Sequence, residues 1–96
     1  MSAYIIFNYV ITDRERIQAL SSRSKACDAR SPYKPNVIVA TAADTVEGNT
    51  LPHLVIYEFD TLEMANGWYY DEATQDVATL RKAITDGWVS IVPGYR

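Results

Sequence analysis

Three stretches of the chain are almost continuously apolar, and β-branched and aromatic residues dominate each of them. They cover residues 3–11, 37–42 and 51–59, and a shorter fourth stretch covers residues 88–92. Such runs predict strands. Because polar residues do not alternate regularly with apolar ones, both faces of the resulting sheet are predicted to be buried.

The first of two predicted helices follows the first strand. It begins at Thr12, where the Thr12 hydroxyl and the Glu15 carboxylate fit a capping box, and it ends before Pro32. Its inward stripe is thin and consists partly of small side chains, namely Ile17, Leu20, Ser24 and Cys27.

The second helix is predicted over residues 61–85, with a bend near Tyr70 and Asp71. Asp86 and Gly87 are predicted to end it. Residues spaced three and four apart predict its buried face, which consists of Leu62, Ala65, Tyr69, Ala73, Val77, Leu80 and Ile84.

The predicted order of elements is therefore βαββαβ. A chain of 96 residues holds one core, so residues 1–96 are predicted to form a single domain. This order predicts an α+β, ferredoxin-like fold in which a four-stranded antiparallel sheet carries two helices on one face. The second face is also apolar and needs a cover. A second copy supplies it most economically, so we expect a homodimer through the sheet face.

Charge and cysteine content narrow the classes of partner and location. The formal net charge of −3 and the pI near 4.9 disfavour a nucleic-acid partner. Cys27 is the only cysteine, which excludes an intrachain disulfide and fits a reducing, cytoplasmic setting. The apolar N-terminal run is short, interrupted and not preceded by a basic segment. It therefore predicts neither a membrane span nor a signal peptide.

The sequence motifs that identify an enzyme most strongly are absent. There is no Gly-rich phosphate loop, no G-x-S-x-G, no H-E-x-x-H and no paired Cys and His metal spacing. We therefore expect neither a cofactor nor a metal site, and the residues leave open whether the protein is an enzyme.

Polar residues inside the apolar strands are the candidate catalytic groups. A carboxylate in a buried strand is a typical general base, which nominates Glu58; the alternative is a structural residue at the end of its strand. His53 is the only histidine, and it is either an acid–base group or an exposed residue at the beginning of its strand. Asn8 is either a donor to a substrate oxygen or a satisfied buried amide. Asn8 and Glu58 lie on adjacent central strands and are expected to share a cavity.

Candidate substrate-binding residues lie on the two helices. Trp68, beside the small Gly67, fits a residue that stacks on a flat apolar ligand, and Tyr69 lies next to it with a place in the core as the alternative. Arg23 is expected to reach the mouth of the pocket from the first helix.

Four segments also resemble a known family. They are residues 1–6, residues 55–59 leading into a capped helix, Trp68 and Tyr69 followed by residues 71–75, and residues 92–94. They resemble the small bacterial family called domain of unknown function 1330, of the dimeric α+β barrel superfamily, over essentially the whole chain.

The resemblance implies a ferredoxin-like protomer, a barrel-like homodimer and a pocket between sheet and helices. Other members of the superfamily are cofactor-independent monooxygenases, muconolactone isomerases and haem-binding proteins. This chain departs from the family pattern at residues 31–36, which lack the usual glycines, and at Thr74, which replaces an aromatic residue. The second departure predicts a wider or more polar pocket wall.

Two functions are therefore open. The first is a cofactor-independent enzyme, monooxygenase-like or isomerase-like, that acts on a small aromatic or enolisable metabolite in the pocket. Glu58 or His53 would then move a proton. The second is a non-catalytic homodimer that binds a small apolar ligand or a protein partner.

Overall fold

A computed structural model describes residues 2–95, and its elements follow the predicted order with the second helix divided in two. The chain forms, in order, β1 (Ala3–Ile11), the 3₁₀ turn η1 (Arg14–Arg16), α1 (Ile17–Arg30), β2 (Asn36–Ala42), β3 (His53–Phe59), α2 (Leu62–Tyr70), α3 (Glu72–Ile84) and β4 (Thr85–Pro93). None of these helices is both long and apolar enough to cross a bilayer.

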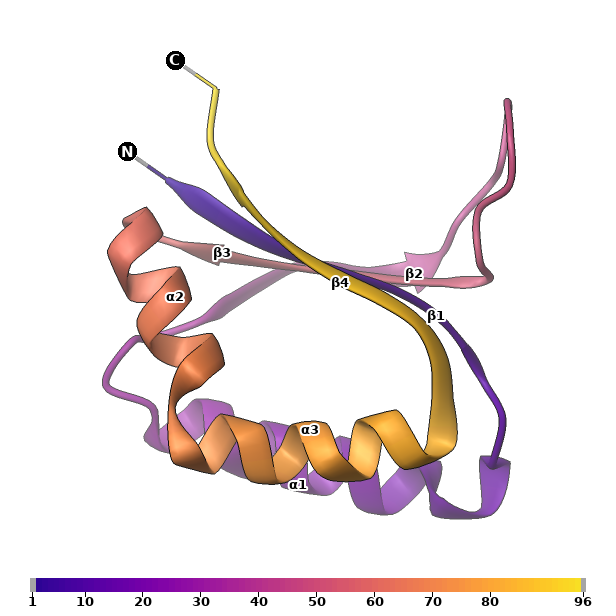
Figure 1. Ribbon diagram of the computed structural model, residues 1–96, viewed down its shortest axis with the longest axis horizontal. Coiled ribbons are helices and arrows are strands. Elements are labelled where there is room, and N and C mark those ends of the chain that lie inside the picture. The colour runs from indigo at the N-terminus through magenta and orange to yellow at the C-terminus, as the bar shows by residue number, and fades with distance from the viewer. Residues whose placement is uncertain (1, 96) are drawn as a thin grey trace.

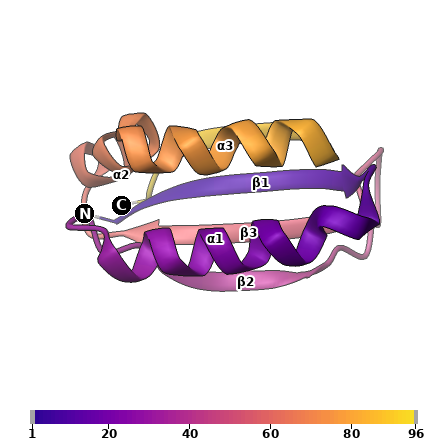
Figure 2. The same cartoon turned by 90° about the horizontal axis from the view of Figure 1, so that it is seen from below.

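The four strands form one antiparallel sheet in the order β2-β3-β1-β4. Figure 1 shows α1 and α3 below this sheet and α2 at its left end, and Figure 2 shows α1 and α3 side by side in front of the strands. The protomer thus has the predicted ferredoxin-like α+β fold, with one helical layer and one open sheet face.

Alternation along the strands decides which side chains meet the helices. Ala3, Ile5 and Phe7 of β1 point to the helices and are buried, as do their neighbours Tyr57 and Phe59 of β3. Ala65 and Trp68 of α2 complete this core. The apolar residues between these positions therefore lie on the open face.

The first helix starts differently from the prediction. Asp13, not Thr12, is the N-cap of the 3₁₀ turn η1: its carboxylate accepts from the Glu15 backbone N–H at 3.1 Å and from the Arg16 Nε at 2.8 Å. The α-helix α1 begins only at Ile17, without a side-chain cap. The backbone N–H of Thr12 donates instead to the carbonyl of Ile84, at 2.8 Å. The capping box at Thr12 was therefore wrong, because tertiary structure places Thr12 at the end of α3.

The predicted bend in the second helix is confirmed at Asp71, where the backbone is extended and separates α2 from α3. This break changes the phase of the buried face, so the predicted stripe was only partly right. Leu62 is 43% exposed and Ala73 is also exposed. The buried residues of the two helices are Ala65, Trp68, Thr74, Ala78 and Ile84.

The predicted helix stop at Asp86 and Gly87 was also wrong, because both residues lie in β4 and pair with Val10 and Tyr9. A Cβ atom at position 87 would overlap the backbone carbonyl of Asn8. Gly87 therefore permits close pairing of two strands rather than ending a helix.

Asn8 is a buried amide whose hydrogen bonds tie the loop before β3 to β1. Its Nδ2 donates to the carbonyls of Leu51 at 3.0 Å and His53 at 2.9 Å, and its Oδ1 accepts from the Leu51 N–H at 3.1 Å. With 2% exposure, the side chain is almost fully removed from water. This arrangement matches the structural alternative for Asn8.

We predict that Asn8→Ala lowers the free energy of unfolding by about 3 kcal/mol, because three hydrogen bonds are lost in a buried position. Urea unfolding followed by far-UV circular dichroism measures the change. Asn66→Ala is the control, since its amide makes one exposed bond within α2, and it should change stability by less than about 0.5 kcal/mol. Equal effects of the two variants would contradict this role.

Candidate functional site

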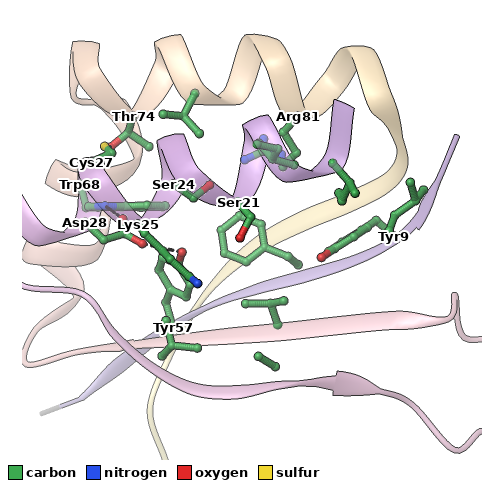
Figure 3. A pocket seen from close by; sticks show the side chains of 18 residues that line it. Tyr9, Ser21, Ser24, Lys25, Cys27, Asp28, Tyr57, Trp68, Thr74 and Arg81 are labelled. Atoms are coloured by element: carbon green, nitrogen blue, oxygen red, sulfur yellow. Dashed lines mark hydrogen bonds between the residues drawn. The ribbon is translucent and has the colours of Figure 1, made fainter. Parts of the chain in front are cut away.

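A cavity of about 360 Å³ lies between the helices and the sheet, where a pocket was expected (Figure 3). Its volume is at the small end of the range for small-molecule sites. Its sheet wall consists of Phe7, Tyr9, Ile11, Val37, Ala40, Val55 and Tyr57, and its helix wall includes Ile17, Leu20, Ser21, Ser24, Cys27, Trp68, Thr74 and Val77.

The space exists because α1 directs small side chains at the sheet. Ser21, Ser24 and Cys27 line the cavity from this helix, and Leu20 is its only large side chain that is buried. Cys27 packs against Thr74, with 4.0 Å between Sγ and Oγ1. The thin stripe seen in the sequence thus corresponds to an unfilled part of the interior.

Among the described residues, the one acidic side chain in the cavity wall is Asp28, near the end of α1. Tyr57 donates its hydroxyl proton to Asp28 Oδ2 at 2.6 Å, and Trp68 donates its indole N–H to Oδ1 at 3.2 Å. One carboxyl group therefore joins α1, β3 and α2, and both of its oxygens are held in place. Figure 3 shows the three side chains together at one end of the cavity.

Burial changes the acidity of these groups. Loss of solvent raises the pKa of Asp28 above its usual value, although the hydrogen bonds from Tyr57 and Trp68 act in the opposite direction. Burial, followed by the hydrogen bond and the charge of Asp28, strongly raises the pKa of Tyr57. Burial also raises the pKa of Tyr9. Both phenols therefore stay protonated at neutral pH, beside an acid that accepts protons more readily than an exposed aspartate.

Of the two aromatic residues predicted to bind substrate, Trp68 lines the cavity and Tyr69 does not. Trp68 lines the cavity and is 5% exposed, and it packs against the rings of Phe7, Tyr57 and Phe59. Tyr69 does not line this cavity; it lines a second one of about 300 Å³ between α3 and β4.

Arg23 is exposed on α1 and is not among the residues of the cavity wall. The basic residues that do line the wall are Lys25 of α1 and Arg81 of α3.

The three predicted catalytic residues are not brought together. Asn8 is opposite Leu54, whereas Glu58 is opposite Tyr4 at the other end of β1, so the expectation that they approach each other was wrong. Both belong to the open face, where Glu58 Oε2 lies 3.4 Å from the Tyr4 hydroxyl. His53 faces the helical side and stacks on Tyr9 at 5.3 Å, but neither His53, Asn8 nor Glu58 lines the cavity. Their catalytic roles remain predictions from the sequence.

Asp28 is the residue that sequence reasoning missed. It follows the buried Cys27 and lies four residues after Ser24, so helical spacing places it beside the inward stripe. That signal was present but indistinct, because a carboxylate at the border of a stripe is usually solvated. Within residues 2–95, no group of three or more His, Cys, Asp or Glu side chains is arranged to hold a metal ion.

Comparison with solved structures shows the same fold in several proteins. SnoaB, a cofactor-independent oxygenase from Streptomyces nogalater, is 10% identical, with 99% of this chain and 94% of that chain covered and a TM-score of 0.68. A dimeric ferredoxin-like protein of unknown function from Thermobifida fusca is 10% identical, with 98% and 92% covered and a TM-score of 0.71. The protein RPA0582 of unknown function from Rhodopseudomonas palustris is 13% identical, with 99% and 83% covered and a TM-score of 0.74.

At the level of sequence, the profile of a domain of unknown function, DUF1330, matches residues 2–95. No curated protein gives a significant match.

We predict that Asp28→Asn changes how stability depends on pH. Below the ordinary pKa of aspartate, near 4, the side chain is protonated in both the folded and the unfolded state. As the pH rises from that value toward the raised pKa of Asp28, the unfolded chain releases the proton while the folded protein keeps it, so the wild type loses stability that the Asn variant keeps. The difference in unfolding free energy, wild type minus variant, should therefore fall as the pH rises above about 4, and it should level off above the raised pKa of Asp28.

Chemical unfolding across this range measures the trend. Asp76→Asn is the matched control, because Asp76 is an exposed aspartate of α3 outside the cavity. A wild-type advantage that grows with pH would contradict the burial of Asp28.

Proposed function

Because the chain belongs to the DUF1330 family, whose description assigns no activity, we propose from the geometry that the cavity is a general-base site. It would act without a cofactor on a small aromatic, enolisable or phenolic substrate. The observation that carries this proposal is Asp28, a carboxyl group of raised pKa that lines an otherwise largely apolar cavity. The oxygenase SnoaB, which shares the fold, supports this class of chemistry by analogy.

The carboxylate of Asp28 would take a proton from the substrate, either from an O–H or from a C–H next to a carbonyl. The electron pair left behind spreads onto the substrate oxygen as an enolate or phenolate. Return of the proton to a different carbon completes an isomerisation. Alternatively, the carbanion bonds to dioxygen and gives a peroxide. The O–O bond then breaks, so that one oxygen atom stays on the carbon as a carbonyl group. The other leaves as water with the proton held by Asp28 and the second hydrogen of that carbon.

The surrounding residues fit this role. Tyr57 and Trp68 fix the orientation of the carboxyl group, so its proton-accepting geometry is set before substrate binds. The Tyr9 hydroxyl points into the cavity in Figure 3 and, because it stays protonated, can donate to the developing oxyanion. Phe7 and Trp68 supply apolar ring surface for a flat substrate.

The experiment uses 2-tetralone, an enolisable bicyclic ketone, and follows exchange of its acidic C–H for deuterium by NMR in heavy water. Wild type should accelerate exchange, and Asp28→Asn should reduce that acceleration by at least about 10²-fold, the usual contribution of a general base. The rate should rise with pH as Asp28 ionises. Oxygen uptake in the same samples separates oxygenation from isomerisation.

Asp76→Asn should leave the exchange rate unchanged, since Asp76 is exposed and outside the cavity. Glu58→Gln and His53→Gln test the residues nominated from sequence. Exchange that survives Asp28→Asn but fails in either of these variants would overturn the assignment to Asp28. A wild type that binds 2-naphthol without accelerating exchange would instead favour the non-catalytic, ligand-binding function.

We also propose that two copies assemble through the open sheet face. By the alternation of the strands, this face carries Tyr4, Ile6, Leu54, Ile56, Trp88 and Val92. Trp88 is 51% exposed in the protomer, an unusual position for so large an apolar side chain. A second copy would cover this apolar surface with its own. Two proteins of similar fold are described as dimeric, which supports assembly into a homodimer.

Sedimentation at micromolar concentration should give twice the protomer mass of 10.8 kDa. Trp88→Glu should shift the protein toward the protomer, because it places a charge in the interface without disturbing the core. Tyr70→Glu is the control, since Tyr70 is 70% exposed on α2. A wild type that sediments as a protomer would contradict the proposal.

We also propose a cytoplasmic location, on the basis of the single cysteine. Cys27 is free and buried, which is consistent with a reducing, cytoplasmic environment.

A further inference from the structure

Arg81 is the one charged residue that belongs to the walls of both cavities. It lies on α3, and its guanidinium carbon is 5.4 Å from the centre of the Phe7 ring. Phe7 and Tyr9 also line both cavities, so these three residues form the partition between them. Arg81 is half-buried and therefore only partly solvated.

This guanidinium group has no acidic partner within residues 2–95. The ion pair found there joins Arg16 to Asp13, at 2.8 Å, and Asp86, which shares the second cavity with Arg81, forms none with it. No hydrogen bond joins the Arg81 guanidinium to another described group. The contact with Phe7 stabilises its charge but does not use its N–H donors.

A half-buried arginine with free donors beside a ligand-sized cavity is suited to binding an anion. Its planar fork matches the two oxygens of a carboxylate, and partial exclusion of water strengthens such a pair. Lys25, also in the wall of the first cavity, adds positive charge to the same space. The one acid facing this space is Asp28, at the end away from Arg81 (Figure 3).

We propose that Arg81 binds an anionic substituent, so that the substrate class of this site is an aromatic carboxylic acid rather than a neutral aromatic compound. This inference rests on the proposed function and names the substrate of the same cavity. The acidic O–H or C–H of such a molecule would lie at Asp28, and its carboxylate would lie at Arg81.

The spacing of the rings supports a ligand that reaches both groups. The Phe7 ring lies 5.2 Å from the ring of Tyr57 and 6.2 Å from that of Trp68, the two residues that hold Asp28. Arg81 contacts the same Phe7 ring. A molecule of one or two fused rings lying along Phe7 would therefore have Asp28 toward one end and Arg81 toward the other.

The test compares two ligands that differ by one carboxylate, 2-naphthol and 6-hydroxy-2-naphthoate, by isothermal titration calorimetry near pH 7. The hydroxyl and the carboxylate of the second ligand lie at opposite ends of its two rings, as the proposal requires. Wild type should bind the acid at least about tenfold more tightly, the effect of one charge-assisted hydrogen-bonded pair. Arg81→Gln should remove this preference while leaving the affinity for 2-naphthol within about twofold. Lys82→Gln, which changes the adjacent residue of α3, should preserve the preference.

Far-UV circular dichroism and thermal unfolding establish that each variant is folded, and Arg81→Lys keeps the charge with a smaller loss of preference. Equal affinities of the wild type for the two ligands overturn the inference, and so does a preference that survives in folded Arg81→Gln. Neither result affects the proposal that Asp28 is a general base, because the exchange of 2-tetralone depends on Asp28 and 2-tetralone carries no carboxylate. Conversely, an Arg81-dependent preference without any exchange keeps the anion site and overturns the proposed catalysis.

Discussion

The mismatch between α1 and the sheet determines the rest of this structure. Protein interiors are normally filled, yet α1 turns serines and a cysteine toward a sheet wall that carries Phe7, Tyr9 and Tyr57. The large aromatic side chains do not fill the gap, because Tyr57 and Trp68 end on the carboxyl group of Asp28. The cavity and its acid thus have one structural origin.

Asp28 has two effects that oppose each other. Its hydrogen bonds to Tyr57 and Trp68 join three elements and favour the ionised carboxylate, whereas removal from water favours the protonated form and outweighs them. A group balanced in this way keeps a fixed orientation and still accepts a proton readily. The same low solvation strengthens the interaction of Arg81 with any anion that enters the cavity. The position and the environment of Asp28 and Arg81, more than their residue types, therefore make them candidates for catalysis and for anion binding.

Much of the fold was predictable because it depends on local patterns. The apolar runs identified the four strands, and the weak helical signal near Tyr70 and Asp71 identified the break between α2 and α3. The buried face of α3 was not predictable, because the extended backbone at Asp71 rotates α3 relative to α2. The spacing of apolar residues in the sequence does not reveal the size of that rotation. The same limit explains Gly87, whose role depends on the approach of β1 rather than on its neighbours in sequence.

The site was harder to predict for a related reason. When both sets of alternate positions in a strand are apolar, the sequence does not show which face meets the helices. Glu58 and Asn8 were therefore candidates for the cavity, although the cavity lies on the other face of the sheet. The structure places Trp68 in the cavity wall, and its role in binding a substrate stays a prediction from the sequence. Asp28 could not be identified from the sequence, because its role depends on hydrogen bonds from Tyr57 of β3 and Trp68 of α2.

The state of Asp28 itself is the most direct test of this account. Carboxyl-detected NMR of protein labelled with ¹³C in aspartate, with Asp28→Asn used for assignment, gives the titration midpoint of this one group. The account predicts a midpoint above the ordinary range of aspartate, and a change in its signal when 2-naphthol is added. A midpoint at or below that range, with no response to the ligand, would contradict it.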